Sequence, residues 1–284
     1  MADLTTVVIA AHDEAAVIDR CLATLLGGAL PGELEVIVSA NGCTDDTAAL
    51  ARRHAGVLVV ESAQPGKTGA LNRAEDHATG TVRIYLDADI EATVSVVRAL
   101  RDALTGPDAA LVAVPSRHLE ITGRPLAVRG YLAVQRRLPV FDEGLFGRGM
   151  IAVSGPGRAR FDTFPDVVAD DLFLDSLFTT AERVRLHDVT VRVATPLRTA
   201  DLVRRLVRVR RGNAALRSTS AAVRRSDRWS WLRDVVVPRP WLAPAAVAYV
   251  AITTWSALLA RRGPVGATTW GRDESTRPVR GRVA

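Results

Sequence analysis

Residues 82–89 read V-R-I-Y-L-D-A-D, an apolar strand pattern that ends in two aspartates, Asp87 and Asp89. Three similar runs come before it in the chain, and they predict strands at Thr5–Ala10, Glu35–Ser39 and Val57–Glu61. These runs are rich in β-branched residues and are apolar on both sides instead of alternating with polar residues. That pattern indicates strands that are covered on both faces of a sheet.

Amphipathic stretches separate the four runs. Their apolar spacing predicts helices at Ala15–Leu26, Thr44–His54, Thr68–Ala78 and Ala92–Leu104. Strands that alternate with helices form a mostly parallel, Rossmann-like α/β sheet with helices on both faces. Ligands of such sheets bind at the carboxyl ends of the strands, so the polar residues at those ends are the candidates for a functional site.

The alternation loosens in the second half of the chain. The patterns there predict strands at Ala109–Val114 and Ile151–Ser154, helices at Arg124–Leu138, Ala169–Phe178 and Asp201–Leu216, a glycine-rich loop at Asp142–Gly149, and a hairpin of Val184–Leu186 with Val189–Val193. No repeat or low-complexity linker separates these parts, so we expect one continuous domain followed by a C-terminal extension.

Charge is distributed unevenly along the 284 residues. Residues 1–110 carry 8 basic and 16 acidic side chains, whereas residues 111–284 carry 29 and 15. The net charge of +6 would allow a basic protein that binds nucleic acid or another anionic surface. The acidic first half would repel a phosphate backbone, and we therefore expect no nucleic acid partner.

Asp87 and Asp89 lie on one side of the chain at the end of a strand. Two carboxylates this close repel each other unless a cation lies between them, and Mg²⁺ in proteins commonly binds one or two carboxylates together with substrate phosphates. The pair therefore predicts a metal–diphosphate site, with the simpler alternative that both aspartates cap the next helix.

Lys67 is the one lysine among 37 basic residues. It follows the third strand and begins a predicted helix, where backbone N–H groups already favour an anion. A phosphate-binding lysine and a solvated loop lysine are both compatible with this position.

Four segments together resemble family-2 glycosyltransferases of the GT-A fold, in the order in which they occur in that family. The segments are His12-Asp13-Glu14, Ala40-Asn41-Gly42-Cys43-Thr44-Asp45, Gly66-Lys67 through Asn72, and Leu86-Asp87-Ala88-Asp89. The resemblance extends over residues 4–215. It implies a GT-A sheet and a nucleotide-diphospho-sugar donor.

The resemblance also implies roles for individual residues. It assigns donor binding to Glu14, Asn41, Lys67, Asn72 and Asp87, and an Mn²⁺ or Mg²⁺ ion to Asp89 together with Asp87. One departure concerns the base of the nucleotide, because Ala40 and Asn41 stand where the family has two aspartates. The motif therefore does not identify the base.

A general base is expected in the second half, because inverting transfer needs a carboxylate that accepts the proton of the acceptor hydroxyl. Asp170-Asp171 resembles the family's E-D motif, which makes Asp171 the catalytic residue and places Asp170 on the diphosphate or acceptor side. Helix capping by either aspartate is the alternative. A sugar nucleotidyltransferase on a related sheet is also kept as an alternative for the whole chain.

Arg205 and Arg208 fall where processive members of the family have a Q-x-x-R-W segment. The resemblance assigns these two arginines to the diphosphate or acceptor side. The tryptophan of that segment is Val209 here, which favours transfer of a single sugar over polymerisation.

Trp241–Ala260 contains no charged residue, and arginines flank it on both sides. A helix of 20 residues spans about 30 Å, enough for the core of a bilayer. Membrane contact and a buried core helix are the two readings. The first favours a hydroxyl acceptor that is lipid-linked or a polysaccharide precursor.

These assignments divide the chain into three parts. We expect a donor-binding half at 1–110, an acceptor and catalytic half at 111–217, and an extension at 218–284 that holds the apolar helix 241–260 and a polar tail. No secretory signal is visible at the N-terminus, and the chain has only two cysteines. We therefore expect a cytoplasmic protein associated with the cytoplasmic face of a membrane.

Overall fold

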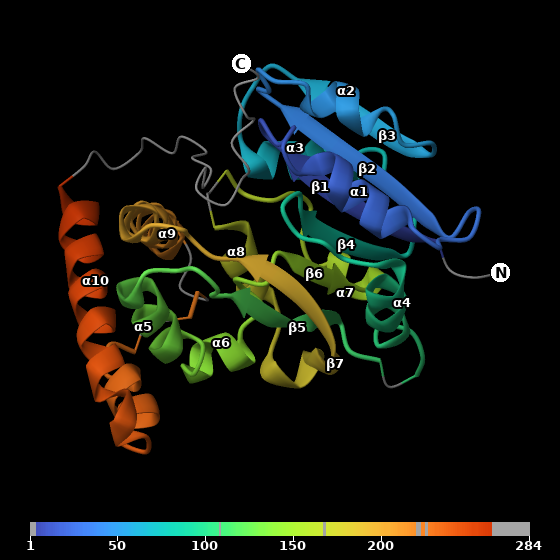
Figure 1. The fold of residues 1–284 in the computed structure, drawn as a ribbon. Helices are drawn as coiled ribbons and strands as arrows, with labels where there is room; N and C mark the ends of the chain where they lie inside the picture. The colour runs from blue at the N-terminus through green and yellow to red at the C-terminus, as the bar shows by residue number, and fades with distance from the viewer. Residues whose placement is uncertain (1–3, 108, 167–168, 220–222, 225–226, 263–284) are drawn as a thin grey trace.

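The computed structural model describes residues 4–107, 109–166, 169–219, 223–224 and 227–262. A seven-stranded sheet in the order β3-β2-β1-β4-β6-β5-β7 runs through the molecule (Figure 1). Its strands are β1 (Thr5–Ala11), β2 (Leu34–Asn41), β3 (Val57–Ser62), β4 (Val82–Asp87), β5 (Val112–Glu120), β6 (Met150–Val153) and β7 (Arg183–Ala194). The predicted α/β class is confirmed.

The first four strands are parallel, as the apolar runs predict. β6 is antiparallel to both of its neighbours, β4 and β5. It connects the strands of the first half to those of the second half, so the two predicted halves share one sheet. β4 is the central strand, and its carboxyl end lies where the two halves meet.

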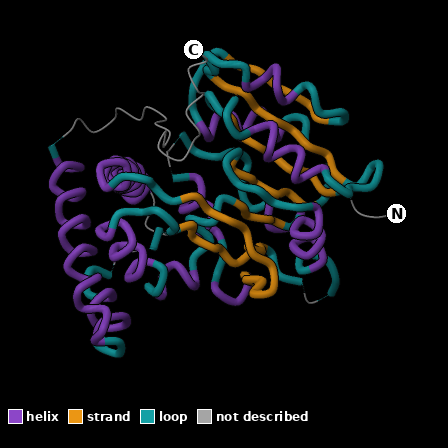
Figure 2. Tube along the Cα trace, viewed as in Figure 1, coloured by secondary structure: helices purple, strands orange, loops and turns teal. Residues whose placement is uncertain are grey.

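Helices cover both faces of the sheet (Figure 2). Because successive strand residues point to opposite faces, Val7 and Ile9 of β1 pack with α1 (Ile18–Leu26), α2 (Thr47–Ala51) and α4 (Val94–Asp102). Val8 of the same strand joins the opposite core.

The opposite core is formed by α3 (Lys67–Glu75) and α8 (Asp170–Leu177). Three short elements complete the main domain: α6 (Pro139–Glu143), α7 (Gly155–Arg158) and η1 (Thr180–Glu182). α3 and α8 each begin at a residue predicted for the site, so their packing on this face sets where those side chains lie.

The predicted hairpin at 184–193 is wrong. Residues 183–194 form one strand, β7, which pairs in parallel with β5 on both sides of a bulge. The register shifts between Pro115 and Ser116 of β5, and residues 187–189 of β7 bulge out at that point. The polar pair His187-Asp188 resembles a turn in sequence, but here it occupies the bulge.

The predicted helix at Thr44–His54 is much shorter in the structure. α2 begins only at Thr47, whose backbone N–H donates to Asp45 Oδ1 at 3.0 Å. The residues before it form a loop that binds the end of β1, described below. The apolar spacing therefore predicted a helix that begins too early, because tertiary contacts hold the residues before Thr47 in a loop.

A helical layer closes the far end of the domain (Figure 1). It contains α5 (Leu126–Gln135), α9 (Thr199–Thr219), η2 (Trp231–Val236), η3 (Pro240–Leu242) and α10 (Ala243–Arg261). Gly130 lets α5 approach α10 closely, since a Cβ there would lie 3.2 Å from the Cβ of Ala248. The predicted apolar helix 241–260 is thus confirmed as η3 plus α10, while the predicted polar tail lies outside the described residues.

Candidate active site

Lys67 bridges two carboxylates that come from separate parts of the chain. Its Nζ lies 2.7 Å from Oδ1 of Asp87, at the end of β4, and 3.0 Å from Oδ2 of Asp170, at the start of α8. Lys67 itself begins α3, directly after Gly66, which has a φ of 146° that side chains rarely tolerate. The sequence-predicted donor and catalytic segments therefore meet at this lysine.

The electrostatics of the cluster follow from its partial burial. Burial acts to raise the pKa of Asp87, but the adjacent Lys67 outweighs burial and holds that pKa below its ordinary value. Burial dominates at Asp170, whose pKa is raised although Lys67 opposes the shift. Burial would lower the pKa of Lys67, yet Asp170 and Asp87 together raise it. Lys67 is therefore a permanent cation between the two carboxylates.

Asp171 lies beside this pair and has different partners. The backbone N–H of Gly147 donates to its Oδ2 at 3.1 Å, and the N–H of Leu172 donates to its Oδ1 at 2.8 Å. Burial and the neighbouring charge of Asp170 raise the pKa of Asp171 to about 6. A carboxylate with such a pKa accepts a proton readily near neutral pH.

The loop between α6 and β6 is a part of the site that the sequence flagged only as glycine-rich. Gly147 and Gly149 both have positive φ, at 70° and 68°. Arg117 Nη1 donates to the carbonyl of Gly147 at 2.9 Å and so fixes the N–H that binds Asp171. A Cβ on Gly149 would collide with Ile90 and lie 3.2 Å from Asp87 Oδ2. The glycine spacing was the available signal for this loop, whereas nothing in the sequence pointed to Arg117.

α9 brings two of the predicted arginines towards the cluster. Arg205 and Arg208 are both half-buried, and their charges contribute to lowering the pKa of Asp87. Val209, the next residue, is 42% exposed. The helix thus directs positive charge to the end of β4.

Glu14 and Asp89 lie at the same edge of the sheet. The thiol of Cys21, buried in α1 below that edge, has its pKa raised to about 12 by burial and then by the charges of Asp89, Glu91, Asp87 and Glu14. Glu14 is half-buried, and Asp89 is exposed. The carboxylates that follow β1 and β4 therefore act together on the thiol of Cys21.

The side chains of Asn41 and Asn72 hydrogen-bond to backbone groups of other segments of the chain. Asn41 is fully buried, and its Nδ2 donates to the carbonyl of Gly66 at 2.7 Å, directly before Lys67. The amide of Asn72 pairs with both backbone groups of Phe164, at 2.9 and 2.7 Å. In the structure both side chains hold segments of the chain, and their predicted contact with a donor stays a prediction.

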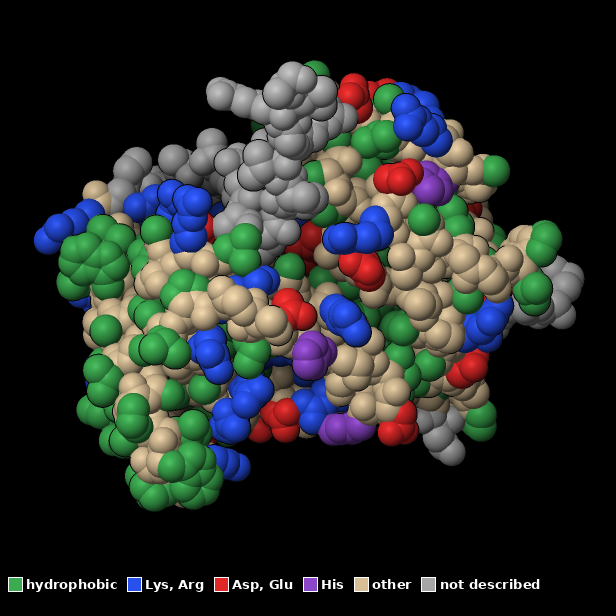
Figure 3. Space-filling model, in the orientation of Figure 1, with side chains coloured by type: hydrophobic (Ala, Val, Ile, Leu, Met, Phe, Trp, Pro, Cys, Tyr) green, Lys and Arg blue, Asp and Glu red, His purple; other side chains and the backbone are tan. Residues whose placement is uncertain are grey.

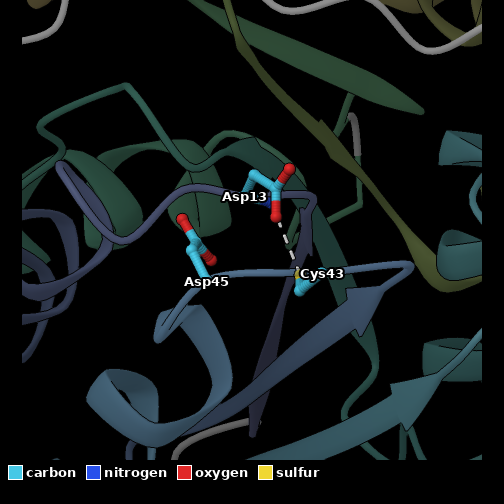
Figure 4. Close-up of side chains that lie close together, drawn as sticks. All are labelled: Asp13, Cys43 and Asp45. Carbon is cyan, nitrogen blue, oxygen red and sulfur yellow. Dashed lines mark hydrogen bonds between the residues drawn. The ribbon is translucent and has the colours of Figure 1, made fainter.

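A second group of possible metal ligands consists of Asp13, Cys43 and Asp45 (Figure 4). Asp13 Oδ1 accepts from the N–H of Thr44 at 2.6 Å, and Asp45 Oδ2 accepts from the N–H of Ala15 at 3.1 Å. Burial raises the pKa of the Cys43 thiol, which disfavours the thiolate that would bind a metal. This group ties the loop after β1 to the loop after β2.

The fold and the site together define an enzyme that handles an anionic substrate at the carboxyl edge of an α/β sheet. The chain belongs to glycosyl transferase family 2, which it matches over residues 6–149. It is therefore a glycosyltransferase, and the nucleotidyltransferase and nucleic-acid-binding alternatives no longer apply to its class.

A solved structure agrees in fold, and a second one shows a weaker similarity. A mannosyltransferase from Pyrobaculum calidifontis, in complex with GDP-Man and Mn²⁺, is 22% identical and superposes with a TM-score of 0.60 over 92% of this chain and 79% of its own. Glucosyl-3-phosphoglycerate synthase from Mycobacterium tuberculosis, in complex with Mn²⁺ and UDP, is 19% identical, with a TM-score of 0.48 over 68% of this chain and 71% of its own. None of the curated proteins searched matches the sequence.

The Lys67 bridge makes a prediction about stability. In Lys67→Met the carboxylates of Asp87 and Asp170 lose their shared cation, and Asp170 is 10% exposed. We expect the free energy of unfolding to fall by on the order of 2 kcal/mol at pH 7.5. Most of this loss is expected from Asp170, because the side chain of Asp87 is 41% exposed and is screened by solvent. Unpaired carboxylates have pKa values above those of the unfolded chain, so the deficit shrinks as the pH falls towards 5.

Urea denaturation of wild type and Lys67→Met at both pH values measures this difference. Lys67→Arg keeps a cation and serves as the control, with a smaller deficit that changes little with pH. A deficit of equal size at pH 5 and pH 7.5 in Lys67→Met contradicts the bridge.

Proposed function

We propose that the enzyme transfers one sugar from a nucleotide-diphosphate donor to a hydroxyl acceptor, with inversion at the anomeric carbon. The observation that carries this proposal is the difference among three adjacent carboxylates. Asp87 and Asp170 each form an ion pair with Lys67, whereas the contacts of Asp171 among the described residues are backbone N–H groups. Asp171 is therefore the carboxylate suited to accept a proton.

In the proposed reaction the acceptor hydroxyl attacks the anomeric carbon of the donor. Its proton passes to Asp171, and the bond between the anomeric carbon and the diphosphate oxygen breaks with its electron pair on the diphosphate. The products are the glycoside and a nucleoside diphosphate. One base and one displacement suffice, so no covalent intermediate on the protein is needed.

The leaving diphosphate carries negative charge that the site can compensate. Lys67 lies at the N-terminus of α3, and Arg205 and Arg208 approach Asp87 from α9. Fixed positive groups aimed at a developing charge stabilise the transition state. This concentration of positive charge supports the donor role proposed for Lys67 and Asp87.

The carboxylates also fit a divalent metal ion. Asp87 keeps 41% of its side chain exposed, and Asp89 is exposed two residues later at the same strand end. Both offer the hard oxygen ligands that Mg²⁺ and Mn²⁺ prefer. We assign the ion to Asp89 and Asp87, where it would supply Lewis-acid stabilisation of the diphosphate.

The acceptor is proposed to be lipid-linked or a polysaccharide precursor at the cytoplasmic face of a membrane. α10 supports this, because Pro240–Arg261 is the one helix among the described residues that is long and apolar enough to cross a bilayer. Residues 1–110 then form the donor half and residues 111–217 the acceptor half. The exposed Val209, in place of an acceptor-stacking tryptophan, supports single-sugar transfer.

Asp171→Asn tests the base. We expect turnover to fall at least ~100-fold, the usual size of a general-base contribution, while donor binding is retained. In the wild type kcat/KM should rise with pH through about 6 and then level off, because only the ionised carboxylate accepts the proton. Steady-state rates and donor titrations measure both. Unchanged turnover in Asp171→Asn would rule out this role.

Asp89→Asn tests the metal. We expect Mn²⁺ to raise the thermal midpoint of the wild type in the presence of its nucleotide sugar, and this increase to vanish in Asp89→Asn and with EDTA. Asp76→Asn, which removes an exposed carboxylate at the end of α3, is the matched control and should behave as the wild type. Full turnover of the wild type in EDTA contradicts the metal assignment. Screening a panel of nucleotide sugars in the same assay identifies the donor.

A further inference from the structure

α10, together with η3 directly before it, exposes an apolar stripe along its outer side. Trp241 and Val247 are each 70% exposed, Trp255 is 53% exposed and Leu258 is 47% exposed. We call these four residues the α10 face. Three further apolar side chains are exposed just before the helix begins: Trp229, Leu232 and Val237. Figure 3 shows apolar side chains gathered along the edge where α10 lies, with basic side chains beside them.

The opposite side of α10 is an integral part of the fold. Ile252 and Ala246 are buried against α5, α9 and η2, and Ser256 is fully buried and accepts a hydrogen bond from Arg210 Nε at 3.1 Å. The guanidinium of Arg211 donates to the carbonyls of Leu259 and Ala260, the last turn of the helix. A helix held in this way cannot cross a bilayer without leaving those arginines and apolar residues uncovered.

A pocket lined by charged residues opens next to the start of α10. Its cavity of about 380 Å³ is lined by three arginines (Arg136, Arg137 and Arg239) together with Pro139 and three acidic residues. Burial and the charges of Arg136 and Arg239 lower the pKa of Arg137. The three guanidinium groups therefore lie close enough to repel one another.

The acidic residues of the pocket form ion pairs with arginines that do not line it. Asp142 pairs with Arg185, Glu143 with Arg224, and Asp234 with Arg233. Among the described residues, none of the three pocket arginines has an ion pair with a carboxylate. The pocket therefore offers positive charge to an anion from outside the chain.

From these observations we propose that the α10 face and the pocket arginines form one docking surface for an anionic lipid bilayer. α10 lies in the plane of the interface with its apolar face among the acyl chains, and Arg136, Arg137 and Arg239 bind lipid phosphates beside it. Residues 228–262 carry five arginines and one aspartate, so the charge around the apolar stripe is complementary to anionic headgroups. This deepens the membrane part of the proposed function and does not depend on its catalytic part.

Vesicle flotation of the full chain tests the surface. The wild type should float with vesicles of phosphatidylcholine and phosphatidylglycerol, bind phosphatidylcholine alone at least ~10-fold more weakly, and be released by alkaline carbonate. A variant with Trp241→Ser, Val247→Ser, Trp255→Ser and Leu258→Ser should lose binding to both kinds of vesicle. Arg136→Gln with Arg137→Gln and Arg239→Gln should lose the preference for the anionic vesicles.

Matched controls remove similar groups from the donor half of the chain. Leu30→Ser with Leu58→Ser removes exposed leucines, and Arg20→Gln with Arg52→Gln and Arg53→Gln removes exposed arginines. Both controls should float as the wild type does. Circular dichroism of every variant verifies the fold, and donor turnover with a water-soluble acceptor is followed in parallel, so that a failure of docking is distinguished from a failure of catalysis.

Three results would overturn the proposal. The first is a wild type that floats with no vesicle, and the second is resistance to carbonate, which indicates a helix that spans the bilayer. The third is a stable dimer in solution that the serine variant of the α10 face dissociates, since the face would then be covered by a second copy of the chain.

Discussion

The bridge from Lys67 to Asp87 and Asp170 is the interaction on which the site depends. It joins the end of β4, the start of α3 and the start of α8, three points that lie far apart in the sequence. Two carboxylates could not lie this close in a partly buried position without a cation between them. Lys67 offsets part of the negative charge of that pair, and burial together with the charge of Asp170 keeps the pKa of the adjacent Asp171 raised. The three carboxylates therefore differ in pKa because they differ in burial and in their distance from one lysine.

Apolar periodicity was sufficient to predict β1 to β4, the presence but not the full extent of the helices between them, and therefore the edge at which the candidate site lies. It failed where long-range pairing decides the structure. β7 reads as a hairpin because His187-Asp188 interrupts it, and only its pairing with β5 makes it one strand. The motifs likewise located Lys67 and Asp171 but not Arg117, which acts through the backbone of Gly147. Asn41 and Asn72 bind backbone groups, a role that residue type alone does not reveal.

The arginine excess of the second half has several separate causes. Arg183 is paired with the buried Asp175, and Arg148 is itself buried and donates to the backbone carbonyls of Pro115 in β5 and Phe141 in α6. Arg205 and Arg208 face the donor edge, whereas Arg136, Arg137 and Arg239 lie beside the apolar face of α10. A single net charge therefore combines arginines in the core, at the candidate site and on the surface, and it does not identify a partner.

The central claim is that one base, Asp171, assists a single displacement at the anomeric carbon. Proton NMR of the freshly formed glycoside measures the configuration of that carbon relative to the donor. The arrangement of Lys67, Asp170 and Asp171 predicts inversion, because no step places the sugar on a protein side chain. A product that keeps the configuration of the donor would contradict the account.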